Sequence, residues 1–145
     1  MKIAIGSDHA GFHLKEQLRA YLENHGHTLL EQGPQKAERC DYPDFAAKVC
    51  RAIQAGEAER GILICGTGIG MSMAANKFKG IRAAVITDAF CARLTREHND
   101  CNVLCLGERI IGVGLAQAIV DAWCAARFEG GRHQARIDKM MSIEK

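Results

Sequence analysis

The chain has 145 residues, enough for one domain, and 48% of them are hydrophobic while 25% are charged. This composition is ordinary for a globular protein and argues against a disordered or fibrous chain. The formal net charge of +2 gives no reason to expect nucleic acid or a membrane as a partner.

The chain start and the cysteines indicate where the protein works. Residues 1–8 reach an acidic side chain after too few apolar residues for a signal peptide or a membrane span. The seven cysteines are an odd number and contain no Cys-x-x-Cys pair. This usage favours reduced thiols over disulfides or a zinc site. We therefore expect a cytoplasmic protein without a bound metal.

Short apolar runs alternate with longer stretches of helical period, which predicts repeated βα units. In chain order the pattern predicts a strand at 2–6, a helix at 12–24, a strand at 28–31, a helix capped by Asp44 at 44–55, a strand at 61–65, a short helix at 69–77, a strand at 82–86, a helix from Thr87 or Asp88 to Glu97, a strand at 102–106, a helix at 113–128 and a helical tail at 132–145. The predicted fold is α/β, a doubly wound sheet of five parallel strands in a single domain, 1–145, with a C-terminal helical tail.

Polar residues follow several predicted strands directly. Asp8 and His9 come after the first strand, and Asp88 comes after the fourth. Cys65 ends the third strand and opens a loop with glycines at alternate positions. Because ligands of such sheets bind outside the carboxyl ends of the strands, this edge is the predicted site.

The loop Cys65-Gly66-Thr67-Gly68-Ile69-Gly70 departs from three common phosphate-binding patterns at one residue, Met71. A Walker loop needs Gly-Lys-Ser/Thr after its variable residues. A cysteine phosphatase needs an arginine at position 71 to clamp the phosphoryl oxygens. A dinucleotide fingerprint needs its third glycine there, although Asp88 could still hold a ribose. A non-catalytic nucleotide or sugar-phosphate binding module therefore stays open as an alternative.

Two interpretations compete for the Cys65 thiol. A free cysteine often packs as a small hydrophobe at the end of a core strand. Against this, the thiol lies at the start of a predicted helix, where the dipole and free amides stabilise a thiolate. The glycines also leave backbone amides unshielded, as in an anion hole. A thiolate base beside such a cradle suits proton transfer at a carbon next to a carbonyl.

Six motifs occur in order along the chain: Gly6-Ser7-Asp8-His9-Ala10-Gly11, Asp41-Tyr42-Pro43, Cys65-Gly66-Thr67-Gly68-Ile69-Gly70, Ala74-Ala75-Asn76-Lys77, His98-Asn99-Asp100 and Gly130-Gly131-Arg132-His133. With them the sequence resembles type B ribose-5-phosphate isomerases, a family that also holds galactose-6-phosphate isomerase subunits. The resemblance spans nearly the whole chain. It implies a Rossmann-like fold and a cofactor-free aldose-ketose isomerase of the pentose phosphate pathway. Ribose 5-phosphate and ribulose 5-phosphate would interconvert through a cis-enediolate, and a six-carbon substrate such as allose or galactose 6-phosphate stays open.

The same resemblance implies roles for individual residues. Cys65 would be the base, Thr67 would assist ring opening, and His98 would be the acid that opens the furanose ring. The amides of the loop would hold the enediolate oxygens, which concerns Gly66, Gly68, Ile69 and Gly70. Further substrate contacts are implied for Asp8, His9, Tyr42, Asn99, Arg109, Arg132 and Arg136. In this family the histidine and Arg109 reach in from a partner subunit, so a homodimer, or a tetramer, with shared sites is expected.

The residues themselves support part of this assignment. Arg132 and Arg136 are four apart, so on a helix they project from one face and can grip a phosphate together. His98 ends a predicted helix, where it is equally suited to partner the helix dipole. Asp8 suits a helix N-cap as well as a sugar contact.

Members of the family that lack the cysteine carry a glutamate at the position of Met71. This chain has a thiol at 65 and a thioether at 71. It is therefore expected among the members that use a thiol, and the other six cysteines are expected to pack in the interior.

Overall fold

Five parallel strands form one sheet in the order β2-β1-β3-β5-β4. They are β1 (Lys2–Ser7), β2 (Thr28–Glu31), β3 (Arg60–Cys65), β4 (Ala83–Val85) and β5 (Val103–Gly107). The computed structural model describes residues 1–144. The central strands are apolar on both faces, as a parallel sheet covered on two sides requires. The prediction of a doubly wound sheet of five parallel strands is confirmed.

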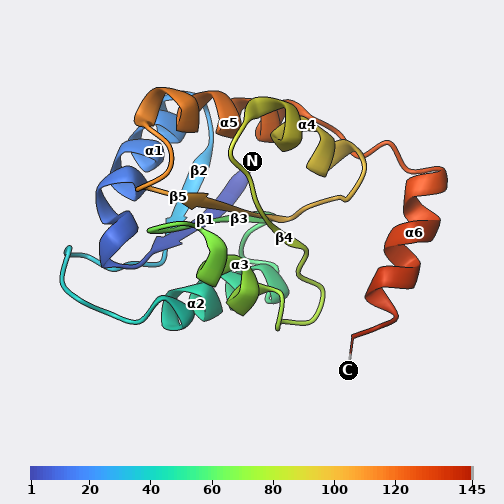
Figure 1. Cartoon of the computed structure of the whole chain (residues 1–145), viewed down its shortest axis with the longest axis horizontal. Coiled ribbons are helices and arrows are strands. Elements are labelled where there is room, and N and C mark those ends of the chain that lie inside the picture. The colour runs from blue at the N-terminus through green and yellow to red at the C-terminus, as the bar shows by residue number, and fades with distance from the viewer. Residues whose placement is uncertain (145) are drawn as a thin grey trace.

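Helices cover both faces of the sheet (Figure 1). One face carries α1 (Phe12–Asn24), α4 (Ala89–Glu97) and α5 (Val113–Ala125), and the other carries α2 (Tyr42–Gln54) and α3 (Ile69–Ala75). A short 3-10 turn, η1 (His9–Gly11), precedes α1. The last helix, α6 (Arg132–Met141), stands apart from both layers at one side of the molecule (Figure 1). No helix among residues 1–144 is both long and apolar enough to cross a membrane.

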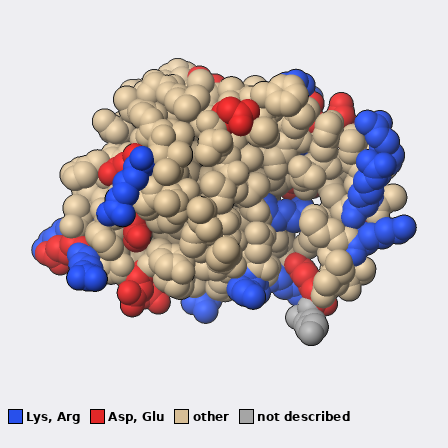
Figure 2. Space-filling view, in the orientation of Figure 1, with Lys and Arg blue, Asp and Glu red and all other residues tan. Residues whose placement is uncertain are grey.

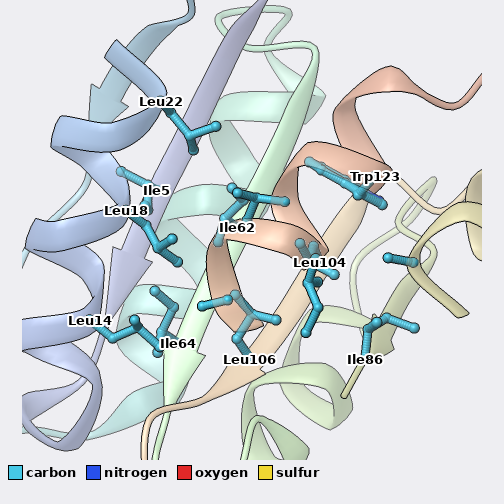
Figure 3. Packing of buried hydrophobic residues seen from close by; sticks show 14 of the residues in the cluster. Ile5, Leu14, Leu18, Leu22, Ile62, Ile64, Ile86, Leu104, Leu106 and Trp123 are labelled. Carbon is cyan, nitrogen blue, oxygen red and sulfur yellow. The ribbon is translucent and has the colours of Figure 1, made fainter. Parts of the chain in front are cut away.

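The larger apolar cluster lies between the sheet and the layer of α1 and α5 (Figure 3). Ile62 and Leu104 project from the central strands toward Leu18 of α1 and Trp123 of α5, and all four side chains are fully buried. A second cluster on the opposite face contains residues of α2 and α3 together with Cys65. The apolar core therefore packs directly against the end of β3, where Cys65 lies.

The predicted elements differ from the observed ones mainly at helix ends. Asp44 is not the cap of α2, because the helix already begins at Tyr42 with Asp41 in the N-cap position. Pro43 fits the first turn of a helix, where its missing N–H costs nothing. Asp88 does cap α4, since its carboxylate accepts from the Cys91 N–H.

The remaining differences are of one to a few residues: β1 and β3 are each one residue longer than predicted, β5 is shifted by one residue, and other elements are shorter. The helix predicted at 113–128 ends at Ala125, because Ala126 is already extended with ψ of 147°. The helices predicted at 69–77 and 132–145 end at Ala75 and Met141, and the strand predicted at 82–86 covers 83–85.

A buried lysine joins α1 to the end of β2. Lys15 is fully buried, and its Nζ lies 2.7 Å from Glu31 Oε1 and donates to the Pro34 carbonyl at 2.7 Å. The same Glu31 oxygen accepts from the Gly33 N–H. One ion pair thus fixes the turn from which the chain passes to α2.

Replacing this lysine should destabilise the fold. Lys15→Met removes the nearer of the two positive charges beside Glu31, the other being Arg19 at 3.6 Å. We therefore expect the free energy of unfolding to fall by about 2 kcal/mol, since removing one partner of a buried pair is costly. Urea denaturation measures this change. Lys36→Met is the matched control, because the Lys36–Glu38 pair is exposed and such pairs contribute roughly 0–1 kcal/mol. Equal losses in the two variants would contradict the role given to Lys15.

Candidate active site

The strand order places a switch point between β1 and β3. From β1 the chain moves outward to β2 on one side, and it then returns to form β3 on the other side. Crevices at such points, at the carboxyl ends of the strands, bind ligands in doubly wound sheets. Ser7 pairs with Ile64 across this point, so Asp8 and Cys65 follow side by side. The structure therefore brings the two predicted residues to one edge.

Asp8 is held by the turn that follows β1. Its Oδ1 accepts from the Ala10 N–H at 2.9 Å and from the Gly11 N–H at 3.1 Å, which confirms the N-cap alternative. His9 Nδ1 accepts from the Cys40 N–H at 3.3 Å, so the segment before α2 is tied to this turn. Asp8 is buried and His9 is half-buried at the edge of the predicted site.

The Cys65 thiol receives a hydrogen bond from its own loop. The Gly68 N–H donates to Cys65 Sγ at 3.1 Å, and the Ile69 N–H donates to Thr67 Oγ1 at 3.2 Å. Gly68 adopts a left-handed conformation with φ of 81°, which turns its amide back toward the sulfur. Cys65 is 6% exposed. An amide directed at the sulfur stabilises a thiolate, because the negative charge accepts the hydrogen bond more strongly than a neutral thiol.

Three close contacts place the loop between its neighbours. A Cβ on Gly107 of β5 would lie 2.7 Å from the Thr67 backbone, and one on Gly70 would lie 2.7 Å from the Tyr42 ring. Arg109 Nη1 would lie 3.3 Å from a Cβ on Gly66. The loop is therefore packed between β5 and Tyr42. The Arg109 guanidinium lies over the loop of its own chain, whereas the resemblance implied an arginine that reaches in from a partner subunit.

The turn after β5 also holds the loop through its backbone. The Glu108 N–H donates to the Cys65 carbonyl at 2.9 Å, and the Arg109 N–H donates to the Gly66 carbonyl at 3.1 Å. Glu108 Oε1 in turn accepts from the Leu14 N–H at 2.6 Å and so caps the first turn of α1. Sequence reasoning missed Glu108, because its partner is remote in the chain.

The remaining cysteines differ in environment. Burial raises the pKa of Cys50 to about 12 and that of Cys124 to about 11, so both remain protonated at neutral pH. Cys101 and Cys105 are buried as expected. The expectation of burial is wrong for Cys91, which is exposed in the first turn of α4. Met71 is fully buried beneath the loop.

A second group of predicted site residues lies at the end of α4 and on α6. His98, Asn99 and Arg136 line a cavity of about 260 Å³ together with His133. The His98 and His133 rings are stacked, with centroids 4.3 Å apart and planes inclined by 12°. Burial lowers the pKa of His133, and the positive charges of Arg132, His98 and Arg136 lower it further. Sequence reasoning quoted His133 within a motif but gave it no role.

Glu129 lies beside His98 and His133, but the geometry of the whole group suits an anionic ligand better than a metal ion. Glu129 Oε1 lies 3.6 Å from His98 Nε2 and 3.4 Å from His133 Nε2. Ligand atoms of the three residues lie within 4.8 Å of one another. However, a metal ion binds in the plane of an imidazole, and two stacked rings do not share a plane. Arg132 and Arg136 also add positive charge on α6, where Lys and Arg side chains are prominent (Figure 2), and arginines favour phosphate or carboxylate ligands.

The two groups of predicted site residues lie at opposite ends of the strands. Cys65 is at the carboxyl end of β3 and pairs with Gly107 at the carboxyl end of β5. Helix α4 starts beyond the carboxyl end of β4 and returns the chain to the start of β5, so His98 lies near the amino ends. Along β5 the two ends are roughly 13 Å apart, at about 3.3 Å per residue. One chain therefore holds two separate halves of the predicted site.

The sheet order and the glycine loop at the switch point define a doubly wound α/β protein, a class that binds its ligands at this point of the sheet. The chain belongs to the ribose/galactose isomerase family, whose model matches residues 3–140. It is similar to ribose-5-phosphate isomerase B of Escherichia coli strain K12, with 51% identity over 99% of this chain and 96% of the relative.

Two solved structures are also similar. The Clostridium thermocellum ribose-5-phosphate isomerase B has 52% identity and a TM-score of 0.97, covering 99% of this chain and 97% of that one. The Mycoplasma genitalium ribose-5-phosphate isomerase B with bound ribulose-5-phosphate has 43% identity and a TM-score of 0.93, covering 97% and 94%.

Glycine substitutions should separate strained from open positions. Gly68→Ala forces a Cβ into a left-handed residue, 3.0 Å from the Leu106 backbone, so the free energy of unfolding should fall by about 1–2 kcal/mol or more. Gly114→Ala is the control, because this glycine lies inside α5 with open space around it, and alanine should stabilise the helix by about 0.5 kcal/mol. Thermal denaturation of both variants measures the difference, and a loss in both would contradict this account of the loop.

Proposed function

We propose that the chain is an aldose-ketose isomerase that interconverts ribose 5-phosphate and ribulose 5-phosphate, a reaction of the pentose phosphate pathway. The observation that carries this proposal is the Cys65 thiol at the sheet edge, hydrogen-bonded by the Gly68 N–H at 3.1 Å. Membership of the isomerase family and the similarity to ribose-5-phosphate isomerase B support the substrate.

Proton transfer follows from the loop geometry. The Cys65 thiolate takes the proton from C2 of the open aldose, and the C–H electrons form the C1–C2 double bond while the carbonyl oxygen becomes an enediolate oxygen. The C2 hydroxyl then gives its proton to O1, so the negative charge moves to O2. The thiol returns its proton to C1 as the O2 electrons form the carbonyl at C2. Because the Gly68 and Ile69 amides already donate within the loop, we assign the Gly66 and Gly70 amides to the enediolate oxygens. Thr67 lies between them and assists ring opening.

Substrate binding requires groups from both halves of the site. Asp8 and His9 follow β1 beside the end of β3, and Tyr42 packs on the loop at Gly70. These three residues contact the sugar, and Arg109 adds a positive charge over Gly66. His98 is the acid that opens the furanose ring, and Asn99 binds sugar hydroxyls. Arg132 and Arg136 bind the phosphate from one face of α6. No metal ion or organic cofactor takes part in this mechanism.

A homodimer with shared sites would join the two halves. Cys65 and His98 lie at opposite sheet edges of one chain, so a second chain that presents its α4 end and α6 to the loop would complete each site. Large apolar side chains are exposed on segments that follow β3, β4 and β5, including Ile69, Met73, Phe90 and Ile110. Where such side chains form one contiguous patch they mark a protein interface, and this edge is where the proposed dimer requires one. A tetramer could contain the same paired unit.

A six-carbon sugar phosphate is the alternative substrate, because the family model includes galactose isomerases. Comparison of kcat/KM for ribose 5-phosphate, allose 6-phosphate and galactose 6-phosphate in the presence of a chelator distinguishes them. We expect the highest value for ribose 5-phosphate. Preference for a hexose phosphate would favour the alternative, and binding without turnover would favour a non-catalytic sugar-phosphate module.

Removal of the thiol should abolish most of the activity while leaving the fold intact. We expect Cys65→Ala to lower kcat by ~10²-fold to 10⁴-fold, the range for a positioned acid or base. Cys91→Ala is the matched control, because this exposed cysteine lies outside both halves of the site, and it should keep kcat within about twofold of the unsubstituted protein. A stopped-flow or coupled assay measures both variants, and near-normal turnover without Cys65 would exclude the thiolate mechanism.

Subunit mixing tests whether the site is shared. His98→Ala and Cys65→Ala chains should each keep only a small residual activity alone, and one site of every mixed dimer would hold both intact residues. Random exchange should therefore restore about one quarter of the full activity, because half of the dimers are mixed and each has one intact site. Subunit exchange is verified with differently tagged chains, and proven exchange without recovery would contradict a shared site.

A further inference from the structure

The turn that follows His98 and Asn99 is closed by an unusual residue. Asp100 has φ of 48°, and within residues 1–144 it is the only residue other than glycine with a positive φ. Its N–H donates to the Arg96 carbonyl at 3.3 Å, which is the hydrogen bond of a helix that ends in a left-handed residue. Glycine or asparagine ordinarily occupies this position, because a Cβ disfavours the conformation. Aspartate tolerates the conformation less readily than glycine, so the contacts of its carboxylate are of interest.

Two arginines hold the Asp100 carboxylate from opposite directions. Oδ1 lies 2.8 Å from Arg96 Nη1, and Oδ2 lies 3.2 Å from Arg82 Nη2. Arg82 Nε also donates to the Asp100 carbonyl at 2.9 Å. Among residues 1–144, neither arginine has an ion pair with any other carboxylate. Arg96 is 6% exposed, so its charge depends on this one partner.

The arginines connect the turn to rigid parts of the fold. Arg96 belongs to α4 and also donates to the Cys101 carbonyl at 2.8 Å, where the chain enters β5. Arg82 precedes β4, and its N–H donates to Asn102 Oδ1 at 2.7 Å. The turn is thus fixed to the helix on one side and to the sheet on the other.

Arg82 also reaches the last helix. Its Nη1 lies 4.0 Å from Met141 Sδ at the end of α6, across a cavity that Arg82 and Asn99 line with residues of that helix. One side chain therefore contacts both the turn that carries His98 and the helix that carries Arg136. This contact adds to the stack of His133 on His98, which joins the same two segments directly.

We infer that Asp100 is a positioning residue, which through Arg82 and Arg96 holds His98 and Asn99 in the orientation that the reaction needs. The inference rests on the proposed isomerase function. Asp100 itself contacts the two arginines and its own turn, and it acts on the substrate through His98. A displaced His98 imidazole would still be present, but it would protonate the furanose oxygen from the wrong direction. Misplacement by about 1 Å is enough to cost up to 10²-fold in rate.

Two substitutions separate the carboxylate from the backbone. Asp100→Gly suits the left-handed conformation and removes only the carboxylate, and we expect kcat for ribose 5-phosphate to fall on the order of tenfold. Asp100→Asn keeps a residue that tolerates this backbone and one hydrogen bond to an arginine, so we expect a loss of roughly threefold. Glu97→Gln is the control, because it removes the Arg93 ion pair of the same helix without touching the turn, and kcat should remain within about twofold.

A double substitution distinguishes positioning from general loss of structure. In a His98→Ala background the Asp100→Gly change should lower the residual kcat by less than about twofold, because the group that Asp100 orients is already absent. The same tenfold loss in that background would overturn the inference. So would unchanged kcat in Asp100→Gly alone.

The His98 ring provides a readout that needs no substrate. His98 stacks on His133, so its imidazole proton resonances carry a ring-current shift. Asp100→Gly should move these resonances and Glu97→Gln should not, and identical spectra would overturn the positioning role. If the unsubstituted protein fails to isomerise ribose 5-phosphate while the resonances still move, the proposed function fails and the positioning of His98 by Asp100 stands.

Discussion

The contact between the glycine loop and the backbone of β5 determines the geometry of the first half of the site. A side chain on Gly107 would collide with the Thr67 backbone, so the two segments approach as closely as polypeptide chains can. At this distance the amides of Glu108 and Arg109 reach the carbonyls of the loop. One backbone interface therefore sets the positions of the thiol, the loop amides and Arg109, and no flexible side chain lies between them.

The second half of the site depends on the path of the chain through α4. A helix that connects two parallel strands must return the chain to the amino edge of the sheet. His98, at the end of α4, is therefore separated from Cys65 by the length of β5. The histidine and the thiol cannot meet inside one such unit, whatever side chains surround them. The separation of the two groups of predicted site residues follows from topology, and the charges on α6 bear only on which ligand suits the remote group.

The sequence allowed the elements and the loop to be predicted because both signals are local. Apolar runs of strand length recur with helical stretches between them, and the thiol with its alternate glycines occupies consecutive positions. The insertion of β5 between β3 and β4 was not predictable in this way, because all three strands read as similar apolar runs. The start of α2 was misplaced because Asp44 and Asp41 both fit a helix start, and only Pro43 distinguishes them.

Site residues held by long-range contacts were missed for the same reason. Glu108 meets Leu14 only after the sheet has formed, and the stack of His133 on His98 requires α6 to fold back beside α4. Asp100 was quoted within a motif, but no local pattern reveals its left-handed conformation or its two arginines.

The burial of Met71 limits which side chain this position can carry. The Met71 side chain is fully enclosed in the cluster that contains Cys50, Cys65 and Ala75. A carboxylate placed there would lose its hydration and find no charged partner among these side chains. A carboxylate base at this position would therefore require the start of α3 to turn outward as well, which is a change of backbone and not only of one side chain.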